Sequence, residues 1–413
     1  MPGAGERGRG LNVQAGSGPI LIAGGGIGGL TLSLALAKWG RRSRILEARD
    51  TFSEAGAGIQ LGPNATRLLR DFGIATGLGR SAVSPEGIHV RDGISGQFLA
   101  DLPLGSWIES RHGAPYLVTH RADLQSALLD AVRASPLIEI SNGFRVEAIS
   151  EDAAGVHVRN SDGTVATGPI LVGADGIWSR IRTLLHPDFA LTYSGTAATR
   201  AILPMSEVPT EQRALRTGVW LAPSAHIVHY PVRGGDALAI VVITSDPDPG
   251  VGWGIPVSAE SVMSHVTGFD SSVRLLLSRA DDWHRWALFN PKPLRRWSRG
   301  RVTLLGDAAH PILPFLAQGG AMAIEDAAVL GWEIARGYGT YTHIFQAYED
   351  QRITRVTQVQ KSSRDNGTAY HLSGIAATTR NLALASAPTN MIMQRYDWIY
   401  GWQHDMEYGE VEL

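Results

Sequence analysis

His226 and Tyr230 are the residues whose types and spacing first suggest acid–base chemistry. They occur in the segment His-Ile-Val-His-Tyr, inside a stretch of alternating apolar residues that is typical of a β-strand. Side chains four residues apart on a strand share one face, whereas His229 points to the other. An imidazole titrates near neutrality and can accept a hydroxyl proton. We predict His226 as a base and Tyr230 as an orienting hydroxyl; the alternative is a histidine satisfied structurally within the sheet.

A glycine-rich turn is the second candidate site. Gly24-Gly25-Gly26-Ile27-Gly28-Gly29 fits the pattern G-x-G-x-x-G between an expected strand at 19–23 and an expected helix at 28–38. Glycines permit the tight turn and let a pyrophosphate approach the backbone at the positive end of the helix. Glu47 ends the next expected strand, where its carboxylate could accept from ribose hydroxyls. We predict a dinucleotide site made of Gly24, Gly26, Ile27, Gly28, Gly29 and Glu47; a purely structural turn is the alternative.

Two further turns follow apolar strands. Asp175-Gly176 comes after Leu171-Val-Gly-Ala, and Gly306-Asp307 comes after Val302-Thr-Leu-Leu. Arg121 stands in His-Arg-Ala-Asp-Leu at the expected start of a helix. Taken singly, Asp175 could be only a turn residue and Arg182 only a solvated helix charge.

In combination, these segments resemble the single-component flavin-dependent aromatic hydroxylases, which carry three such fingerprints. The resemblance spans most of the chain, from Gly24 to Gly401. It implies that Asp307 holds the ribityl chain of FAD, that Asp175 serves FAD and the passing nicotinamide, and that Arg121 reaches FAD. No second G-x-G-x-x-G follows a strand, so we expect FAD as the bound cofactor and NADH or NADPH as a transient co-substrate.

The segment 311–326 contains the residues that are expected to lie beside the flavin ring, called the flavin wall below. Its prolines fix an extended loop, and Gly319-Gly320 opens a helix whose positive N-terminus, with Ala321, would face the flavin. Within the resemblance, several motifs look like those of the 3-hydroxybenzoate 6-hydroxylases. Those enzymes have Gln where this chain has Pro314, and the 6-hydroxynicotinate enzymes have His where this chain has Phe315. We place Gln60, Pro314 and Phe315 in the substrate pocket, and consider Arg111 and His112 as further partners of a carboxylate.

The resemblance implies an FAD-dependent monooxygenase that hydroxylates a phenolic aromatic acid with NAD(P)H and O₂ through a flavin C4a-hydroperoxide, with His226 ionising the phenol. The substrate would be a hydroxybenzoate, with salicylate or a hydroxypyridine carboxylate such as 6-hydroxynicotinate as alternatives. A flavin-dependent reductase without oxygen transfer is a second reading. A non-enzymatic carrier on the same fold, as in GDP-dissociation inhibitors, is a third.

Composition narrows the function classes. The chain has 413 residues with 37 Lys+Arg against 39 Asp+Glu, which excludes the strong basic field of a typical nucleic-acid binder. It has no Cys, so disulfides, Cys-ligated metals and thiol catalysis are excluded, and we predict no metal site. No apolar stretch has the length of a membrane span. We expect a cytoplasmic protein that binds no nucleic acid, and the resemblance implies a homodimer.

The elements that position these residues predict an α/β fold. Short apolar runs followed by glycine turns and helices indicate a Rossmann-like FAD-binding domain with a parallel sheet. A period-two block in the middle of the chain indicates a β-rich antiparallel substrate domain that interrupts it, and C-terminal helices follow. Trp283, Trp286 and Trp297 are expected in core or interface packing. The predicted boundaries are a disordered tail at 1–18, an FAD-binding domain at 19–85, 111–190 and 286–350, a substrate domain at 86–110 and 191–285, and a helical segment at 351–413.

Overall fold

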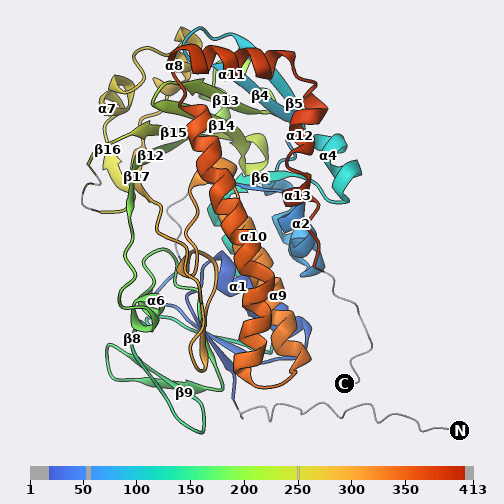
Figure 1. The fold of residues 1–413 in the computed structure, drawn as a ribbon, viewed down its shortest axis with the longest axis vertical. Coiled ribbons are helices and arrows are strands. Elements are labelled where there is room, and N and C mark those ends of the chain that lie inside the picture. Colours follow the sequence, from blue (N-terminus) through green and yellow to red (C-terminus); the bar gives the residue numbers. More distant parts are fainter. Residues whose placement is uncertain (1–17, 53–56, 249, 251, 405–413) are drawn as a thin grey trace, which may run out of the picture.

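A parallel sheet forms the base of the molecule in Figure 1, in a computed structural model that describes residues 18–52, 57–248, 250 and 252–404. The strand order is β18-β11-β1-β2-β7. Residues of β1 and β11 are buried throughout, as in parallel sheets that are covered on both faces. The strands are β1 (Ile20–Ala23), β2 (Ser43–Leu46), β7 (Ile138–Ser141), β11 (Leu171–Gly173) and β18 (Val302–Leu304).

Two helices follow the sheet's functional turns and pack on each other. α1 (Ile27–Lys38) starts at the glycine-rich turn, and α9 (Gly319–Arg336) starts at the glycine pair of the predicted flavin wall. A Cβ on Gly331 would lie 2.8 Å from Cβ of Ala35, so glycine permits the close approach of these helices. Both helices are apolar over most of their surface and are correspondingly buried.

The four strands between residues 138 and 168 divide between two sheets. β7 joins the parallel sheet beside β2, whereas β8 (Val146–Glu151) pairs with β9 (Val156–Asn160), which pairs with β10 (Val165–Gly168). The remaining elements of this half are β3 (Gly58–Leu61), β6 (Leu117–His120), α2 (Pro63–Asp71), α3 (Ile74–Leu78), α4 (Gly105–His112), α5 (Arg121–Ala134) and α6 (Arg180–Leu185).

The predicted β-rich block forms a large sheet above the parallel one (Figure 1). Its order is β16-β17-β12-β15-β14-β13-β4-β5, antiparallel except where β4 pairs with β13. One face packs on α7 (Ala259–Ser264) and α8 (Ser271–Leu277), and the opposite face looks into the molecule. The strands are β4 (Gly87–Asp92), β5 (Phe98–Pro103), β12 (Tyr193–Pro204), β13 (Thr217–Ala222), β14 (Ala225–Val232), β15 (Ala237–Ser245), β16 (Ile255–Val257) and β17 (Trp283–Phe289).

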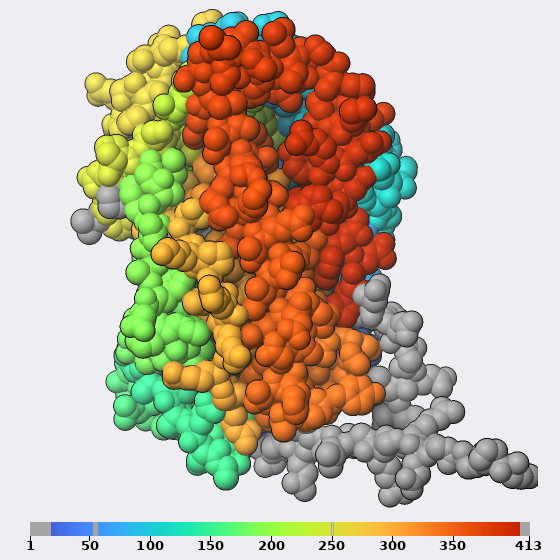
Figure 2. Space-filling model, viewed as in Figure 1, coloured from blue at the N-terminus to red at the C-terminus, as the bar shows by residue number. Residues whose placement is uncertain are grey.

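The C-terminal helices connect the two halves. α10 (Tyr341–Tyr370) is the 30-residue helix that runs from the parallel sheet up to the large sheet (Figure 1). With α11 (Gly374–Ser386), α12 (Thr389–Gln394) and α13 (Asp397–Tyr400), it covers much of the face seen in Figure 2. The predicted boundary at 350/351 falls inside α10, and that at 285/286 falls inside β17. Of the predicted N-terminal tail, residues 1–17 lie outside the described residues.

A buried ion-pair network joins α9 to α10. The side chain of Arg352 is fully buried and donates from Nη1 to Glu325 Oε2 (2.6 Å) and from Nε to Asp326 Oδ1 (2.7 Å). Arg355 also pairs with Glu325, and His310 Nε2 lies 2.5 Å from Asp326 Oδ2. Burial by itself would raise the pKa of Asp326, but His310 and Arg352 outweigh it and hold that pKa below its ordinary value. The network therefore fixes both helices and the loop that leads into residues 311–320.

The tryptophans divide between core and pocket. Trp283 and Trp297 are buried in the core, as predicted. Trp286 is buried as well, and it also lines the central pocket described below. Within the described part of the chain, none of the helices is both long and apolar enough to cross a bilayer.

Candidate active site

A pocket of about 590 Å³ lies between the parallel sheet and the inner face of the large sheet. Its floor comes from the turns that follow β1, β11 and β18 and from the start of α9. Its wall comes from β12, β14, β15 and β17, with β3 on one side. The tertiary structure thus brings the predicted nucleotide turns and the predicted acid–base pair to one cavity.

The glycine-rich turn separates into structural and open positions. Gly24 has φ +104°, and a Cβ on Gly29 would lie 2.0 Å from the carbonyl oxygen of Gly24, so both are required by the fold of the turn itself. A Cβ on Gly28 would meet Leu305 at 2.6 Å. Gly26, by contrast, has no protein atom within 4 Å of its Cβ position, and it lines the pocket at the N-terminus of α1. This open backbone at a helix N-terminus fits the pyrophosphate of a dinucleotide.

This difference predicts opposite behaviour for two alanine substitutions. Gly26 has φ −78°, which alanine adopts readily, so Gly26→Ala is expected to leave the apoprotein fold intact but weaken FAD binding about tenfold or more, ~1.4 kcal/mol. Gly29→Ala is expected to lower the thermal stability of the apoprotein. FAD fluorescence titration and thermal unfolding of both variants measure the two effects. Unchanged FAD affinity in Gly26→Ala would contradict the assignment.

Glu47 does not line the pocket, but its side chain hydrogen-bonds to the glycine-rich turn. Its Oε2 accepts from the Gly25 N–H (2.7 Å), and its Oε1 accepts from the Arg49 N–H (3.0 Å). Arg49 itself lines the pocket. The contacts of Glu47 in this structure are therefore backbone contacts, and binding of ribose hydroxyls by its carboxylate stays a prediction.

Asp175 lines the pocket and also caps α6. Its carboxylate accepts from Ser179 Oγ (2.5 Å) and from the backbone N–H groups of Arg180 (2.7 Å) and Ile181 (3.1 Å). Burial raises its pKa, and these hydrogen bonds oppose the rise. Arg182 is not a solvated helix charge: it is buried, and Nη1 donates to the carbonyls of Asp307 (3.0 Å) and Ala308 (2.9 Å). It therefore ties the second predicted nucleotide turn to the third.

The third predicted nucleotide turn, Gly306-Asp307, lies at the cavity. Asp307 and Arg121 both line the pocket, close enough for the Arg121 charge to act on the Asp307 carboxyl. Gly319 and Gly320 line it as well, at the first turn of α9, where free backbone N–H groups are available. Ile27 lines the pocket from α1, whereas Ala321 is fully buried in the core behind it. All of these residues except Ala321 therefore lie on the floor of the pocket, where FAD binding by them stays a prediction.

His226 lies on the inner face of the large sheet, as its spacing predicts. Together with Val228 and Tyr230 it lines the pocket, whereas His229 lies on the other face and accepts from Trp220 Nε1 (3.2 Å). The ring of His226 is 1% exposed, and burial together with the neighbouring His371 lowers its pKa well below the ordinary value. A neutral imidazole at the pocket wall can accept a proton.

Tyr230 is set against β3. A Cβ on Gly58 would lie 2.4 Å from the Tyr230 ring, so the glycine leaves room for the tyrosine. Burial raises the pKa of Tyr230 to about 12, while Arg200 and Gln60 act against the rise. Gln60 lines the pocket and accepts from Tyr116 Oη (2.7 Å). The Tyr230 hydroxyl is therefore a neutral hydrogen-bonding group.

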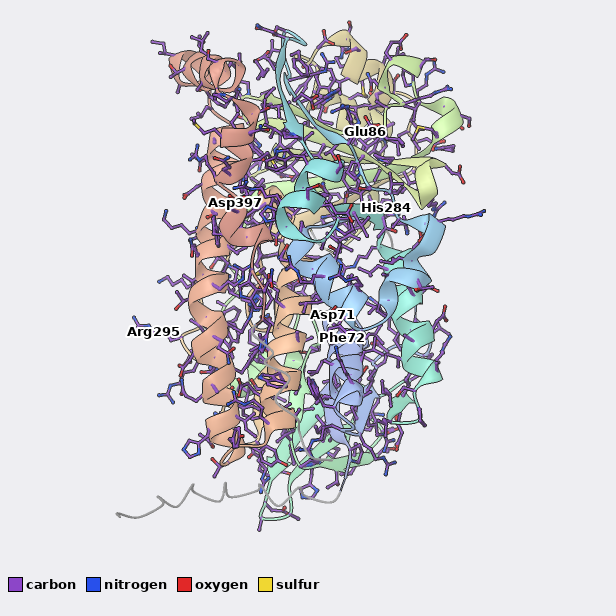
Figure 3. The ribbon with its side chains drawn as sticks, turned by 90° about the vertical axis from the view of Figure 1, so that its right-hand side faces the viewer. Asp71, Phe72, Glu86, His284, Arg295 and Asp397 are labelled. Atoms are coloured by element: carbon purple, nitrogen blue, oxygen red, sulfur yellow. The ribbon has the colours of Figure 1, made fainter. Side chains whose placement is uncertain are left out.

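The other predicted substrate residues fall in different places. Pro314 lines the pocket, while Phe315 packs one layer behind it, with its ring centroid 5.6 Å from that of His226 and its edge against Gly367. Arg111 and His112 do meet a carboxylate, but it is that of Asp397, outside the pocket. Figure 3 labels Asp397 on the C-terminal segment beside α4. Their candidacy as substrate ligands is therefore not supported.

Arg200 is a pocket residue that the sequence analysis did not identify. It projects from β12 into the cavity, with its guanidinium carbon 5.1 Å from the ring centroid of Trp286. Its Nε is buried without a hydrogen-bond partner in the described structure. Burial lowers its pKa, and its interaction with Tyr230 opposes this shift. The available signal was a single arginine in an otherwise small and apolar strand, Ala197-Ala-Thr-Arg-Ala-Ile202.

Comparisons with known proteins show the family of the chain. A family model described as an FAD binding domain matches residues 18–363. The chain is 35% identical over 385 residues to a 3-hydroxybenzoate 6-hydroxylase of Polaromonas naphthalenivorans, covering 93% of this chain and 96% of that protein. It is 36% identical over 356 residues to a 6-hydroxynicotinate 3-monooxygenase of Bordetella bronchiseptica, covering 84% and 91%. A solved salicylate hydroxylase substrate complex has the same fold, with a TM-score of 0.78 at 24% identity, covering 93% and 96%.

The matches extend over nearly the whole chain and include both sheets. They confirm the predicted α/β fold and the predicted FAD cofactor, with NAD(P)H as the co-substrate typical of the family. The chain therefore belongs to the FAD-dependent aromatic monooxygenases.

Proposed function

We propose that the protein hydroxylates a phenolic aromatic acid, using FAD, NAD(P)H and O₂. The observation that carries the proposal is the pocket that is lined by the predicted FAD-binding turns and, opposite them, by a neutral histidine, a neutral tyrosine hydroxyl and the partly buried Arg200. The relatives are named for 3-hydroxybenzoate and 6-hydroxynicotinate, which both join a carboxylate to a hydroxylated ring. The balanced reaction takes one oxygen atom into the ring and releases the other as water.

FAD supplies the transfer of electrons from NAD(P)H to O₂. The chain's own residues orient the ring and move a proton. The Nε2 atom of His226 takes the phenol proton, because its Nδ1 is engaged by His371. Ionisation makes the ring electron-rich, which attack by an electrophilic oxygen requires. Val241, Ile243 and Leu288 line the same wall and exclude water from the reacting atoms.

Arg200 favours an acid as the substrate. The acidic side chains that line the pocket are Asp175, which caps α6, and Asp307, which is near Arg121. Arg200 is partly buried, and its Nε has no hydrogen-bond partner among the described residues, so a bound carboxylate would offset the desolvation of its charge. We therefore place the substrate carboxylate at Arg200 and its hydroxyl at His226, on the same face of the sheet.

The test uses the purified FAD-containing protein. NADH and NADPH oxidation is followed with 3-hydroxybenzoate, salicylate and 6-hydroxynicotinate, and products are identified by mass after reaction with labelled O₂. Incorporation of one labelled oxygen atom into product is expected. Coupled turnover of an aromatic compound without incorporation would establish the reductase instead.

Replacing Arg200 by Gln tests the carboxylate contact. We expect KM for the acid to rise about 10- to 100-fold with little change in kcat, since a hydrogen bond to a charged group contributes about 1.5–3 kcal/mol. Wild type should have a lower KM for the acid than for the corresponding carboxamide, and this difference should disappear in Arg200→Gln. Arg216→Gln, on the same half but paired with Asp101 away from the pocket, is the control. An unchanged preference for the acid would remove Arg200 from substrate binding.

A further inference from the structure

His226 is bonded to a second histidine rather than to a carboxylate. Its Nδ1 lies 2.8 Å from His371 Nε2, where His371 caps the C-terminal end of α10. The ring centroids are 5.0 Å apart. A histidine base is commonly oriented by an acid, whose negative charge would hold a proton on the imidazole. Here the partner is an imidazole that can itself accept and release a proton.

The two rings form a path from the pocket outward. His226 is 1% exposed, and Phe315 and Tyr370 pack around its ring. His371 is only partly buried, so it reaches solvent at the surface of the C-terminal segment. One hydrogen bond therefore connects the wall of the cavity to the outside of the molecule.

The end of α10 is held firmly in this position. Arg380 of α11 donates from Nη1 to the carbonyls of Ala369 (2.9 Å) and Tyr370 (2.8 Å), directly before His371. Asn381 anchors α11 in turn by donating to Asp92 Oδ2 (2.7 Å). The His226–His371 contact is thus built by residues from β14, α10 and α11, far apart in the chain.

We infer that His371 relays the substrate's phenol proton from His226 to solvent, an inference that rests on the proposed function. The phenol proton moves to His226 Nε2, the Nδ1 proton of His226 moves to His371 Nε2, and the Nδ1 proton of His371 leaves to water. Uptake of a proton by the reverse route when product leaves resets both tautomers. No electron transfer is involved, and one proton leaves for each one taken from the phenol.

The charged and titratable groups around His226 and His371 favour transfer of a proton over its retention. Burial and the Arg380 charge lower the pKa of His371, and burial with His371 lowers that of His226. Tyr230 on the same strand is neutral, and so is Tyr370, whose pKa burial raises. Each imidazole is neutral near neutral pH and keeps a single N–H proton, so a second proton that enters the pair displaces one that leaves it.

The experiment measures the proton without turnover. FAD-containing protein is mixed in a stopped-flow instrument with 3-hydroxybenzoate, salicylate and 6-hydroxynicotinate in turn, without NAD(P)H, in weak buffer with a pH indicator. Wild type is expected to release a proton as the ligand ionises. His371→Gln should slow the release roughly 10- to 100-fold while ligand affinity and the flavin spectrum stay unchanged, and added imidazole should restore the rate. His157→Gln, a surface variant beside Asp152, should behave as wild type.

In this assay the relay would be overturned by release at the wild-type rate in His371→Gln, by a slowed variant that imidazole does not restore, or by no release from wild type with any of the acids. Because the assay contains no NAD(P)H, it is independent of oxygen transfer. Proton release without later hydroxylation would leave the relay standing and defeat the proposed function. Hydroxylation that is unaffected by His371→Gln would defeat the relay and leave the proposed function standing.

Discussion

Replacing His226 by Asn is expected to lower the rate of hydroxylation about 10²- to 10⁴-fold at neutral pH, the usual contribution of a general base. The loss follows because no other side chain in the pocket combines a neutral imidazole with a position on the substrate wall. FAD affinity should stay within a factor of about two, because His226 lies on the large sheet and the nucleotide turns lie on the parallel sheet.

The pH profile distinguishes a proton role from a packing role. The pKa of His226 is lowered, so in wild type the imidazole stays neutral and able to accept a proton as the pH falls below neutrality. The variant must capture phenolate from solution, and a phenol with a pKa of about 10 gives about tenfold more of it per pH unit. The deficit should therefore be largest at low pH and shrink as pH rises. A deficit that is constant with pH would exclude the base role, and His229→Asn on the opposite face is the control.

Replacing Arg352 by Met is expected to lower the free energy of unfolding by about 3–5 kcal/mol, the usual cost of breaking a buried ion pair. The variant leaves Glu325 and Asp326 buried with one cation fewer, although Met fills much of the same volume. Because Asp326 also accepts from the Gly306 N–H (3.1 Å), the loop that carries Asp307 should loosen and FAD affinity should fall as well.

Denaturant unfolding of the apoprotein and FAD titration measure the two effects. Arg42→Met, which removes an exposed pair with Glu139, should change stability by no more than about 1 kcal/mol. The double variant Arg352→Met, Asp326→Asn should recover part of the loss, because it removes one of the stranded charges. Wild-type stability in Arg352→Met would mean that the network adds nothing to the hydrophobic packing of α9 on α10.

Homodimer formation and the cytoplasmic location stay predictions, and the choice between NADH and NADPH stays open. The family relation gives FAD and aromatic hydroxylation, whereas the choice of substrate stays a prediction. The experiments on Arg200 and His226 address the substrate directly.

The local motifs could be predicted from the sequence, because each depends on neighbours in the chain. The glycine turn before α1, the turns at Asp175 and Asp307 and the shared face of His226 and Tyr230 all follow from steric rules over a few residues. The residues that these motifs contact depend on the tertiary structure. Arg200 is a candidate substrate ligand because it lines the pocket. Arg111 pairs with Asp397, and His371 bonds to His226, which is 145 residues away in sequence. The physical reason is that burial and long-range pairing set the charge of a side chain, and neither is encoded by its local sequence.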